Sequence, residues 1–457
     1  MKKILLLVLI LAAAGSKAQI VKFSIIGDYG KAGTNELNVS NLVKSWNPEF
    51  VITVGDNNYE LGEQSTIDAN IGQYYRQFIF PYTGSYGSGD TVNRFFPSLG
   101  NHDWYTAGVI PYLNYFTLPG NERYYDFVKG NIHFFCIDSD PNEPDGVDSS
   151  SVQALWLKTA LSNSASKYNI VFFHHAPYSS GQHGSSVYMQ WPFKSWGADI
   201  VLTGHDHTYE RIVLNNFSYI VNGLGGKSIY TFNTPVAGSL VRYNGNYGAM
   251  LANSYNDSLV FKFYSVTPTL RDNFKILPAA KVLSLNIIME GRYNSVSGKM
   301  KGDTVKGILR NKLSPYAKID SALSYVDSAG NGIFSFSKAL NSTDYYIVAD
   351  HRNSLETWSA AGKKFIINSM NYDFSVDSTR ALGNNLIHKG TDYCVISGDV
   401  NKDKIIDAGD LSLIDNAIIN EISGYVITDL TGDYFVDAED LGIADNNSSK
   451  KAVIITP

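Results

Sequence analysis

Short apolar runs alternate with helical patterns through the first part of the chain. Between residues 20 and about 270 the runs are four to seven residues long and rich in Val, Ile and Phe, as expected of strands buried on both faces. After the serines at 149–151, which suit a helix N-cap, apolar residues recur at roughly helical spacing from Val152 to Leu161. The pattern predicts an α/β layered domain over residues 19–275, with its polar site residues on the loops that follow the strands.

The pattern changes after about residue 278. Short β-rich runs without helical periods are separated by turn signals such as segment 327–332. The runs are Leu283–Met289, Val305–Leu309, Ile333–Phe336, Tyr345–Val348 and Phe374–Val376. Their spacing predicts an antiparallel β-sandwich over residues 280–395 that serves as a spacer or binding module. We expect its one charged cluster, His351, Arg352 and Glu356, to lie on a solvated loop.

From residue 397 onward the chain contains an internal repeat. Acidic residues recur 30 positions apart, from Asp399 to Asn416 and from Asp429 to Asn446. In each copy, oxygen-bearing residues fall at positions 1, 3, 5, 9 and 12 of a loop, the ligand spacing of an EF-hand-type calcium loop. These residues are Asp399, Asn401, Asp403, Asp407 and Asp410, then Asp429, Thr431, Asp433, Asp437 and Asp440. Aspartate-rich solvated turns are the alternative interpretation, although two aligned copies are hard to explain that way.

Composition limits the class of protein. A chain of 457 residues is too long for one simple core, so two or three domains are expected. Hydrophobic content of 44% and charged content of 18% are typical of a globular protein. The net charge of −6 gives no sign of a basic surface for nucleic acid, so we expect no nucleic-acid partner. Cys136 lies in an apolar run and reads as a buried thiol, and spacing disfavours a disulfide with Cys394 because the two fall in different predicted domains.

The first residues are typical of a secretory signal. A basic start at residues 1–3 precedes the apolar run Ile4–Ala14 and a small-residue segment, which predicts a signal peptide over residues 1–18. The apolar run is too short to span a bilayer, and later runs are shorter than the roughly 18 apolar residues that a span requires. No cysteine lies near the signal, which disfavours a lipid anchor there. We therefore expect a secreted, periplasmic or cell-surface protein without a membrane span.

Several apolar runs of the first domain end in residues that bind metals. These segments read FSIIGDYG, FVITVGDNNY, FPSLGNHDW, NIVFFHHAPY and ADIVLTGHDHTYER. The candidate metal ligands are Asp28, Asp56, Tyr59, Asn101, His174, His205 and His207. Each fragment alone is a weak signal, because a strand-end Asp is commonly a turn residue. Together, seven ligands suit two metals that share a bridging carboxylate, whereas one metal needs three or four.

The fragments GDYG, GDNNY, GNHD, VFFH and GHDH resemble the five-block signature of purple acid phosphatases within the calcineurin-like metallophosphoesterases. The resemblance covers about residues 20–230 and implies a β-sandwich core flanked by helices. It also implies that Asp28, Tyr59 and His207 bind Fe(III), with Asp56 bridging. Asn101, His174 and His205 would bind a second metal, Fe, Zn or Mn. A tyrosine–Fe(III) bond gives this family its purple colour, so Tyr59 is the discriminating residue.

The chemistry explains these residue types. Carboxylates and a phenolate suit a hard trivalent ion, and imidazole and carboxamide suit a divalent one. Two such ions would hold a phosphoryl group and activate water to hydroxide for in-line attack. His102 and His183 are the candidates to stabilise the transition state or protonate the leaving alkoxide, and His183 matches a histidine at that offset in small mammalian-type family members. His174 has the family spacing and is preferred over His175 as ligand.

The repeat over residues 397–450 resembles a dockerin, a small α-helical module with paired calcium loops. The resemblance implies bound calcium and a cohesin-like or cell-surface partner. Position 6 of each loop, normally a glycine, is Lys404 in the first copy and Tyr434 in the second, which is a departure from the pattern.

We therefore expect a secreted phosphatase acting on phosphate monoesters through an Fe(III)–M(II) pair. The alternative enzyme is a phosphodiesterase or nucleotidase that uses the same site, because the residues that line the pocket determine whether monoesters or diesters are hydrolysed. A surface binding protein with an inactive phosphoesterase domain is the rival from a different class.

Overall fold

The computed structural model describes residues 18–457 and divides them into two compact units. The first unit contains residues 18–157, Tyr168–Lys194 and Ala198–Leu277. The second contains Lys158–Lys167, Ser195–Gly197 and Pro278–Pro457. The predicted signal peptide falls on residues 1–17, which lie outside the described residues, and on Ala18. In the described part of the chain, none of the helices has the length and apolar character needed to cross a bilayer.

The first unit is built on two sheets. Its strands are β1 (Val21–Ile26), β2 (Phe50–Thr53), β3 (Phe95–Pro97), β4 (Tyr125–Lys129), β5 (Ile132–Cys136), β6 (Tyr168–Phe172), β7 (Ile200–Thr203), β8 (Tyr209–Leu214), β9 (Phe217–Asn222), β10 (Ser239–Tyr243), β11 (Gly248–Ser254), β12 (Leu259–Ser265) and β13 (Thr269–Ile276). The six-stranded sheet has the order β13-β12-β11-β1-β2-β3, and the seven-stranded sheet has the order β10-β8-β9-β7-β6-β5-β4. Both are mixed: β1, β2 and β3 are parallel, as are β5, β6, β7 and β9.

Aromatic side chains from both sheets form the core between them. Phe23 of β1 stacks on Phe50 of β2 and meets Phe134 of β5 edge-on, with ring centroids 5.0 Å apart. All three rings are buried, as are the aliphatic residues of the same strands. The sandwich therefore fixes the ends of β1, β2, β6 and β7, the strands that the candidate ligands follow.

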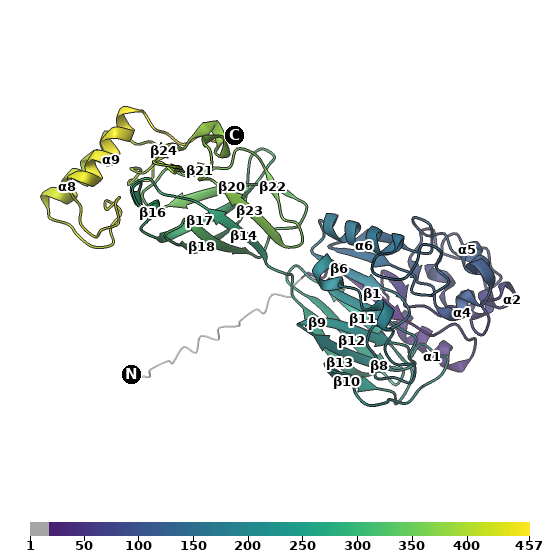
Figure 1. Cartoon of the computed structure of the whole chain (residues 1–457). Coiled ribbons are helices and arrows are strands. Elements are labelled where there is room, and N and C mark those ends of the chain that lie inside the picture. The colour runs from purple at the N-terminus through teal and green to yellow at the C-terminus, as the bar shows by residue number, and fades with distance from the viewer. Residues whose placement is uncertain (1–17) are drawn as a thin grey trace, which may run out of the picture. The chain divides into compact units, whose positions relative to one another are not determined.

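Helices accompany the sheets of the first half of the chain (Figure 1). They are α1 (Thr34–Ser45), α2 (Gln64–Ile67), α3 (Gln73–Tyr75), α4 (Asn101–Trp104), α5 (Ile110–Tyr115), α6 (Val152–Asn163) and α7 (Phe193–Trp196). Helix α1 packs against β11. The start of α6 agrees with the expected cap, because Ser151 Oγ accepts a hydrogen bond from the backbone N–H of Ala154 at 3.2 Å.

The second unit is rich in strands. They are β14 (Lys281–Asn286), β15 (Tyr293–Asn294), β16 (Lys299–Met300), β17 (Asp303–Asn311), β18 (Lys318–Val326), β19 (Asn331–Phe336), β20 (Asp344–His351), β21 (Thr357–Trp358), β22 (Lys363–Lys364), β23 (Ser369–Asp373), β24 (Ile387–Lys389) and β25 (Asp392–Cys394). A three-stranded sheet, β19-β14-β23, and a sheet built on β18-β17-β20-β21 share one core. The expectation of a purely antiparallel sandwich is wrong for one pair, because β14 and β23 run parallel. Phe374–Val376, expected as a strand, follows the end of β23.

Two helices form the end of the chain, α8 (Ala408–Ile419) and α9 (Ala438–Ser449), and Figure 1 shows them beside each other. Each starts at position 10 of one loop of the sequence repeat, so the last loop positions lie in the first turn of the helix. Asp407 and Asp437 cap the helices, each accepting a hydrogen bond from a backbone N–H two residues later. The repeat in sequence is thus a repeat in structure.

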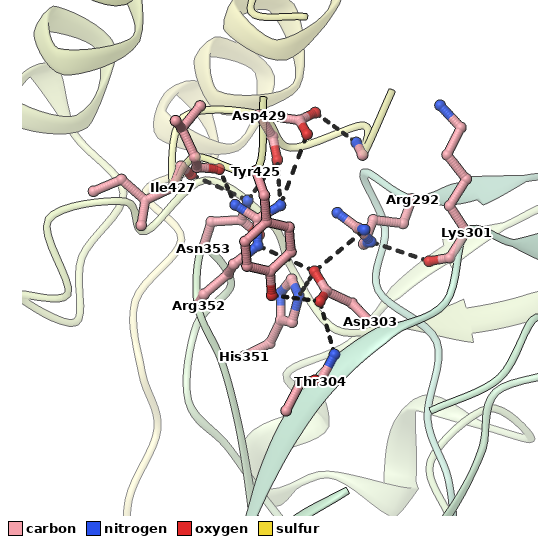
Figure 2. A network of polar contacts seen from close by, with 12 residues as sticks. Arg292, Lys301, Asp303, Thr304, His351, Arg352, Asn353, Tyr425, Ile427 and Asp429 are labelled. Atoms are coloured by element: carbon pink, nitrogen blue, oxygen red, sulfur yellow. Dashed lines mark hydrogen bonds and ion pairs between the residues drawn. The ribbon is translucent and has the colours of Figure 1, made fainter. Parts of the chain in front are cut away.

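A polar network joins this repeat to the sandwich of the same unit (Figure 2). The Asp303 carboxylate lies 3.1 Å from His351 Nε2 and 3.0 Å from Arg352 Nε, and it accepts a hydrogen bond from Tyr425 Oη at 2.6 Å. Arg352 reaches the Asp429 carbonyl at 3.2 Å. The expectation that His351 and Arg352 lie on a solvated loop is therefore wrong, since His351 is 2% exposed and pairs with a charge 48 residues away.

Cys136 and Cys394 are both buried free thiols. Burial raises the pKa of the Cys136 thiol well above its ordinary value. The spacing argument against a disulfide therefore agrees with the structure.

Candidate metal centre

Three of the candidate ligands occupy strained backbone positions directly beyond strand ends. Asp28 follows β1 and Asp56 follows β2, each with φ of 55°, and His205 follows β7 with φ of 70°. Residues other than glycine seldom adopt this left-handed conformation, and such strain is concentrated at functional sites. Hydrogen bonds hold all three: the Asp28 N–H donates to the Gly55 carbonyl, the Asp56 carbonyl accepts from the Gly30 N–H, and the His205 N–H donates to Asp28 Oδ2 at 3.0 Å.

Glycines beside these positions let the loops approach closely. A Cβ on Gly100 would lie 2.3 Å from the Asp56 backbone nitrogen, and one on Gly204 would lie 2.6 Å from Asp28 Oδ2. Any side chain at either position would collide with a candidate ligand. The glycines of the GNHD and GHDH fragments are therefore required by the spacing of the loops.

One group of ligand atoms gathers around the phenol of Tyr59. Tyr59 Oη lies 2.7 Å from Asp56 Oδ2, 3.2 Å from Asp28 Oδ1 and 3.2 Å from His207 Nε2. His207 Nε2 is also 3.3 Å from Asp28 Oδ1. Ligand atoms of Asp28, Asp56 and His207 all lie within 4.8 Å of one another. His207 Nδ1 contacts Ser228 Oγ at 2.6 Å, which orients the ring with Nε2 toward the cluster.

A second group gathers around His174. His174 Nδ1 is 2.8 Å from the Val54 carbonyl, which can only accept, so Nδ1 carries a proton and Nε2 is the ring atom available to a metal. That Nε2 lies 3.1 Å from Asn101 Oδ1, 3.2 Å from His205 Nδ1 and 3.4 Å from Asp56 Oδ1. Asn101, His205 and Asp56 thus each place a potential ligand atom within 3.4 Å of His174 Nε2. The structure brings together all seven ligands expected from the sequence.

Asp56 belongs to both groups. Its Oδ2 faces Tyr59 and its Oδ1 faces His174, while Oδ1 also accepts a hydrogen bond from the His102 N–H at 2.9 Å. One carboxylate between two sets of donors is the arrangement that a pair of neighbouring metal ions requires.

The charges of the centre fit bound cations. Burial, together with the charges of Asp56 and Asp28, raises the pKa of Tyr59 well above its ordinary value. Burial and the neighbouring histidines lower the pKa of His205 well below its ordinary value, so its imidazole is neutral. Burial lowers the pKa of His174, but the charges of Asp56 and Asp28 outweigh it and raise that pKa above its ordinary value. Imidazoles, carboxylates and a phenol that needs positive charge to ionise are a suitable donor set for iron, zinc or manganese.

The two expected acid–base histidines lie beside the ligands. His102 Nδ1 is 2.6 Å from the Glu60 carbonyl, so Nδ1 donates and Nε2 faces Asp56 Oδ2 at 4.0 Å. The His183 ring is exposed and stacks on the His205 ring with centroids 4.3 Å apart. Asp206 holds the His183 loop by accepting that residue's N–H at 2.7 Å. Both histidines are thus within reach of a group bound at the centre.

His175 has a different environment from His174. Its Nδ1 contacts Ser139 Oγ at 3.0 Å, and burial lowers its pKa to about 3. The preference for His174 as ligand agrees with this geometry.

Sequence reasoning missed several supporting residues. Asn57 donates from Nδ2 to Asp103 and to the Ser98 carbonyl, which fixes the loops that carry Asp56 and Asn101. Burial and the Asp56 charge raise the pKa of Asp103 to about 7. Asn57 and Asp103 lie inside the GDNNY and GNHD fragments, so their position in these motifs could have identified them as supporting residues. Ser228 lies beyond the motifs and carries no such signal.

The two calcium loops are alike at most of the candidate positions, but at position 3 Asn401 is exposed and Thr431 is buried. In addition, Asp429 Oδ1, unlike Asp399 Oδ1, accepts a hydrogen bond from the Gly432 N–H at 2.6 Å. The residues at positions 1 and 12 are buried, and those at positions 5 and 9 are partly or fully exposed. Asp410 accepts the N–H groups of Val400 and Asn401, and Asp440 accepts those of Leu430 and Thr431. In neither loop do three carboxylates lie within 4.8 Å of one another among residues 18–457. Lys404 and Tyr434, at the usual glycine position, both adopt left-handed backbone with φ of 83° and 73°.

Comparisons with known proteins find a family model and several relatives that match the first part of the chain. Residues 22–209 match the calcineurin-like phosphoesterase family. Purple acid phosphatase 17 of Arabidopsis thaliana is 26% identical over 241 residues, which are 46% of this chain and 69% of that protein. Tartrate-resistant acid phosphatase type 5 of Oryctolagus cuniculus is 22% identical over 256 residues, 48% of this chain and 76% of that protein. A solved purple acid phosphatase from yellow lupin (Lupinus luteus) seeds is 18% identical with a TM-score of 0.47, covering 57% of this chain and 54% of that one.

Residues 22–209 are thus similar to calcineurin-like phosphoesterase domains, with purple acid phosphatase relatives of low identity, in a unit of the α/β class, and the C-terminal part adds strand-rich sheets. The matches support a phosphoric ester hydrolase and imply a binuclear metal centre. They confirm the sequence-based expectation of a phosphoester-hydrolysing enzyme.

Proposed function

We propose that this chain is a secreted binuclear-metal phosphatase that hydrolyses phosphate monoesters in the manner of purple acid phosphatases. The observation that carries the proposal is the position of Asp56, whose two carboxylate oxygens face different donor groups. In the proposal, Asp28, Tyr59 and His207 hold Fe(III), and Asn101, His174 and His205 hold a divalent Fe, Zn or Mn.

When bound, the metal pair supplies Lewis acidity that polarises phosphoryl oxygens and lowers the pKa of water. The protein contributes orientation and proton transfer. His102 is held through Nδ1 by the Glu60 carbonyl, so Nε2 is the atom that delivers a proton to the leaving alkoxide. His183, stacked on His205, places a second imidazole where it contacts a phosphoryl oxygen.

The test is elemental analysis of the purified full chain beside a panel of phosphoesters. We expect two metal ions per chain and faster hydrolysis of p-nitrophenyl phosphate than of bis-p-nitrophenyl phosphate, with both activities lost after chelation. Faster hydrolysis of the diester would favour the phosphodiesterase reading. Two bound metals without hydrolysis of any phosphoester would favour the binding protein.

Secretion or display at the cell surface is part of the proposal. Its support is the basic start, apolar run and small-residue segment of residues 1–18. The mature N-terminus, determined by sequencing protein from the culture medium or cell envelope, is expected at residue 19. An intact Met1 in protein recovered from the cytoplasm would contradict secretion.

We also propose that the dockerin-like repeat over residues 397–450 binds calcium. Asp399 Oδ1 is buried and has no hydrogen-bond partner among residues 18–457, and burial raises the pKa of this carboxyl to about 6. A calcium ion would satisfy that oxygen. Calorimetric titration should detect calcium binding that weakens in Asp399→Asn, and an isotherm unchanged by the substitution would reject this site. A cohesin-like or cell-surface partner of the repeat stays a prediction.

A further inference from the structure

A lysine from a distant loop lies over the ring of Tyr59. Lys227 Nζ is 4.8 Å from the centroid of that ring, although the two residues are 168 positions apart. The Lys227 backbone belongs to the same site, because its N–H donates to the Asp28 carbonyl at 3.1 Å. Its side chain is 20% exposed. A cation in this position faces a phenol that both Asp28 and Asp56 contact.

Glu60 holds the lysine in this place. Its carboxylate pairs with Lys227 and also with Lys31, the latter at 3.1 Å. Glu60 directly follows Tyr59, and its carbonyl contacts His102 Nδ1 at 2.6 Å. The Glu60 carboxylate is 48% exposed, so its ion pairs contribute little to folding stability. Folding stability from the ion pair with Glu60 therefore gives little reason for a lysine at position 227.

We propose that Lys227 is a positioning residue that tunes Tyr59 as a metal ligand, an inference that rests on the function proposed above. A cation over an aromatic ring is attracted to its π electrons and lowers their energy. Lys227 lies against the ring, whereas a metal held by Tyr59 would be bound through the phenolic oxygen. The lysine charge would therefore lower the energy of the ring electrons more than that of the metal orbitals. Tyr59 then donates less electron density, and charge transfer from its ring to iron requires more energy.

The experiment measures the visible charge-transfer band of the full-length, iron-loaded protein, with metal content determined for each variant. Lys227→Gln and Lys227→Met remove the cation but keep the backbone bond to Asp28, and we expect both to shift the band to longer wavelength. Lys227→Arg restores a cation and should return the band toward the wild-type position. Lys31→Gln is the matched control, because it removes the same charge and the same kind of contact with Glu60, and it should leave the band unchanged.

Each outcome decides the inference. A band at the wild-type position in either neutral variant, with iron bound, overturns it, as does an equal shift in Lys31→Gln. If both neutral variants lose iron while Lys227→Arg keeps it, the charge itself is required and the inference stands. If Lys227→Arg loses iron as well, side-chain shape is responsible and the inference fails. Wild-type protein that binds iron but shows no band would instead contradict the proposed Tyr59–iron bond.

Discussion

Tyr59 Oη donates a hydrogen bond to Asp56 Oδ2 at 2.7 Å, inside a cluster where burial and two carboxylates raise the pKa of the phenol. In the protein without metal, the two carboxylates stabilise the proton on the Tyr59 phenol. A metal ion that binds the phenolate must displace it. Binding at this centre is therefore coupled to release of the Tyr59 proton.

The first prediction concerns this proton. Because the phenol is protonated before metal binds, apparent affinity for iron should increase with pH. Calorimetry in two buffers of different ionisation enthalpy gives the number of protons released. Tyr59→Phe should release about one proton fewer than the wild type at the same pH. Equal release from both proteins would show that Tyr59 does not ionise on binding.

Asp56→Asn should abolish turnover. The substitution removes the one carboxylate that faces both donor groups. Loss of a residue that only supports a metal ligand typically costs about 10- to 100-fold in activity, and we expect kcat/KM of Asp56→Asn to fall by more than this. Asp126→Asn is the control, since Asp126 of β4 pairs with His133 of β5 and its side chain is 41% exposed. Retention of activity in Asp56→Asn would contradict a shared carboxylate.

Ser228→Ala should weaken metal binding without unfolding the protein. Ser228 Oγ fixes the orientation of the His207 ring through a 2.6 Å contact, and loss of such a partner typically lowers metal affinity about 10- to 100-fold. Competition with a chelator measures the affinity, and circular dichroism checks the fold. Exposed Ser150→Ala serves as control. Equal metal affinities in the two variants would show that Ser228 does not support metal binding through His207.

The second unit should lose stability in acid. Burial alone would raise the pKa of Asp303, but hydrogen bonds from His351, Tyr425 and Arg352 and the charge of Arg292 outweigh it and hold the pKa well below its ordinary value. A carboxyl whose pKa is lower folded than unfolded stabilises the fold above the unfolded value, about 3.9, and loses this contribution as pH falls through the folded value. Calorimetric unfolding should therefore show the transition of residues 278–457 weakening below about pH 4.

Asp303→Asn tests that assignment at neutral pH. It leaves buried cations without their counter-charge, so we expect about 3–5 kcal/mol of lost unfolding free energy. Asp344→Asn removes a half-exposed pair with Lys364 and should cost about 1 kcal/mol or less. Similar losses in the two variants would mean that the network in Figure 2 is not a principal support of this unit.

Sequence alone located the candidate ligands because they immediately follow apolar runs in recognisable fragments. Strand ends of parallel sheets meet at one edge, so fragments such as GNHD and GHDH could be assembled without coordinates. The position of Lys227 could not be inferred in this way, because it depends on how a loop after β9 returns to the end of β1. His351 was misjudged for the same physical reason: its partners, Asp303 and Tyr425, come from distant segments. Local polarity indicated exposure, whereas long-range pairing made the residue buried.

The most direct test of a two-metal centre is an anomalous difference map from crystals of the purified, metal-loaded chain. We expect two peaks about 3.5–4 Å apart with the Asp56 carboxylate between them. One peak should contact Tyr59 and His207, and the other should contact His174 and His205. A single peak, or two peaks that share no contact with Asp56, would contradict a two-metal centre bridged by the Asp56 carboxylate.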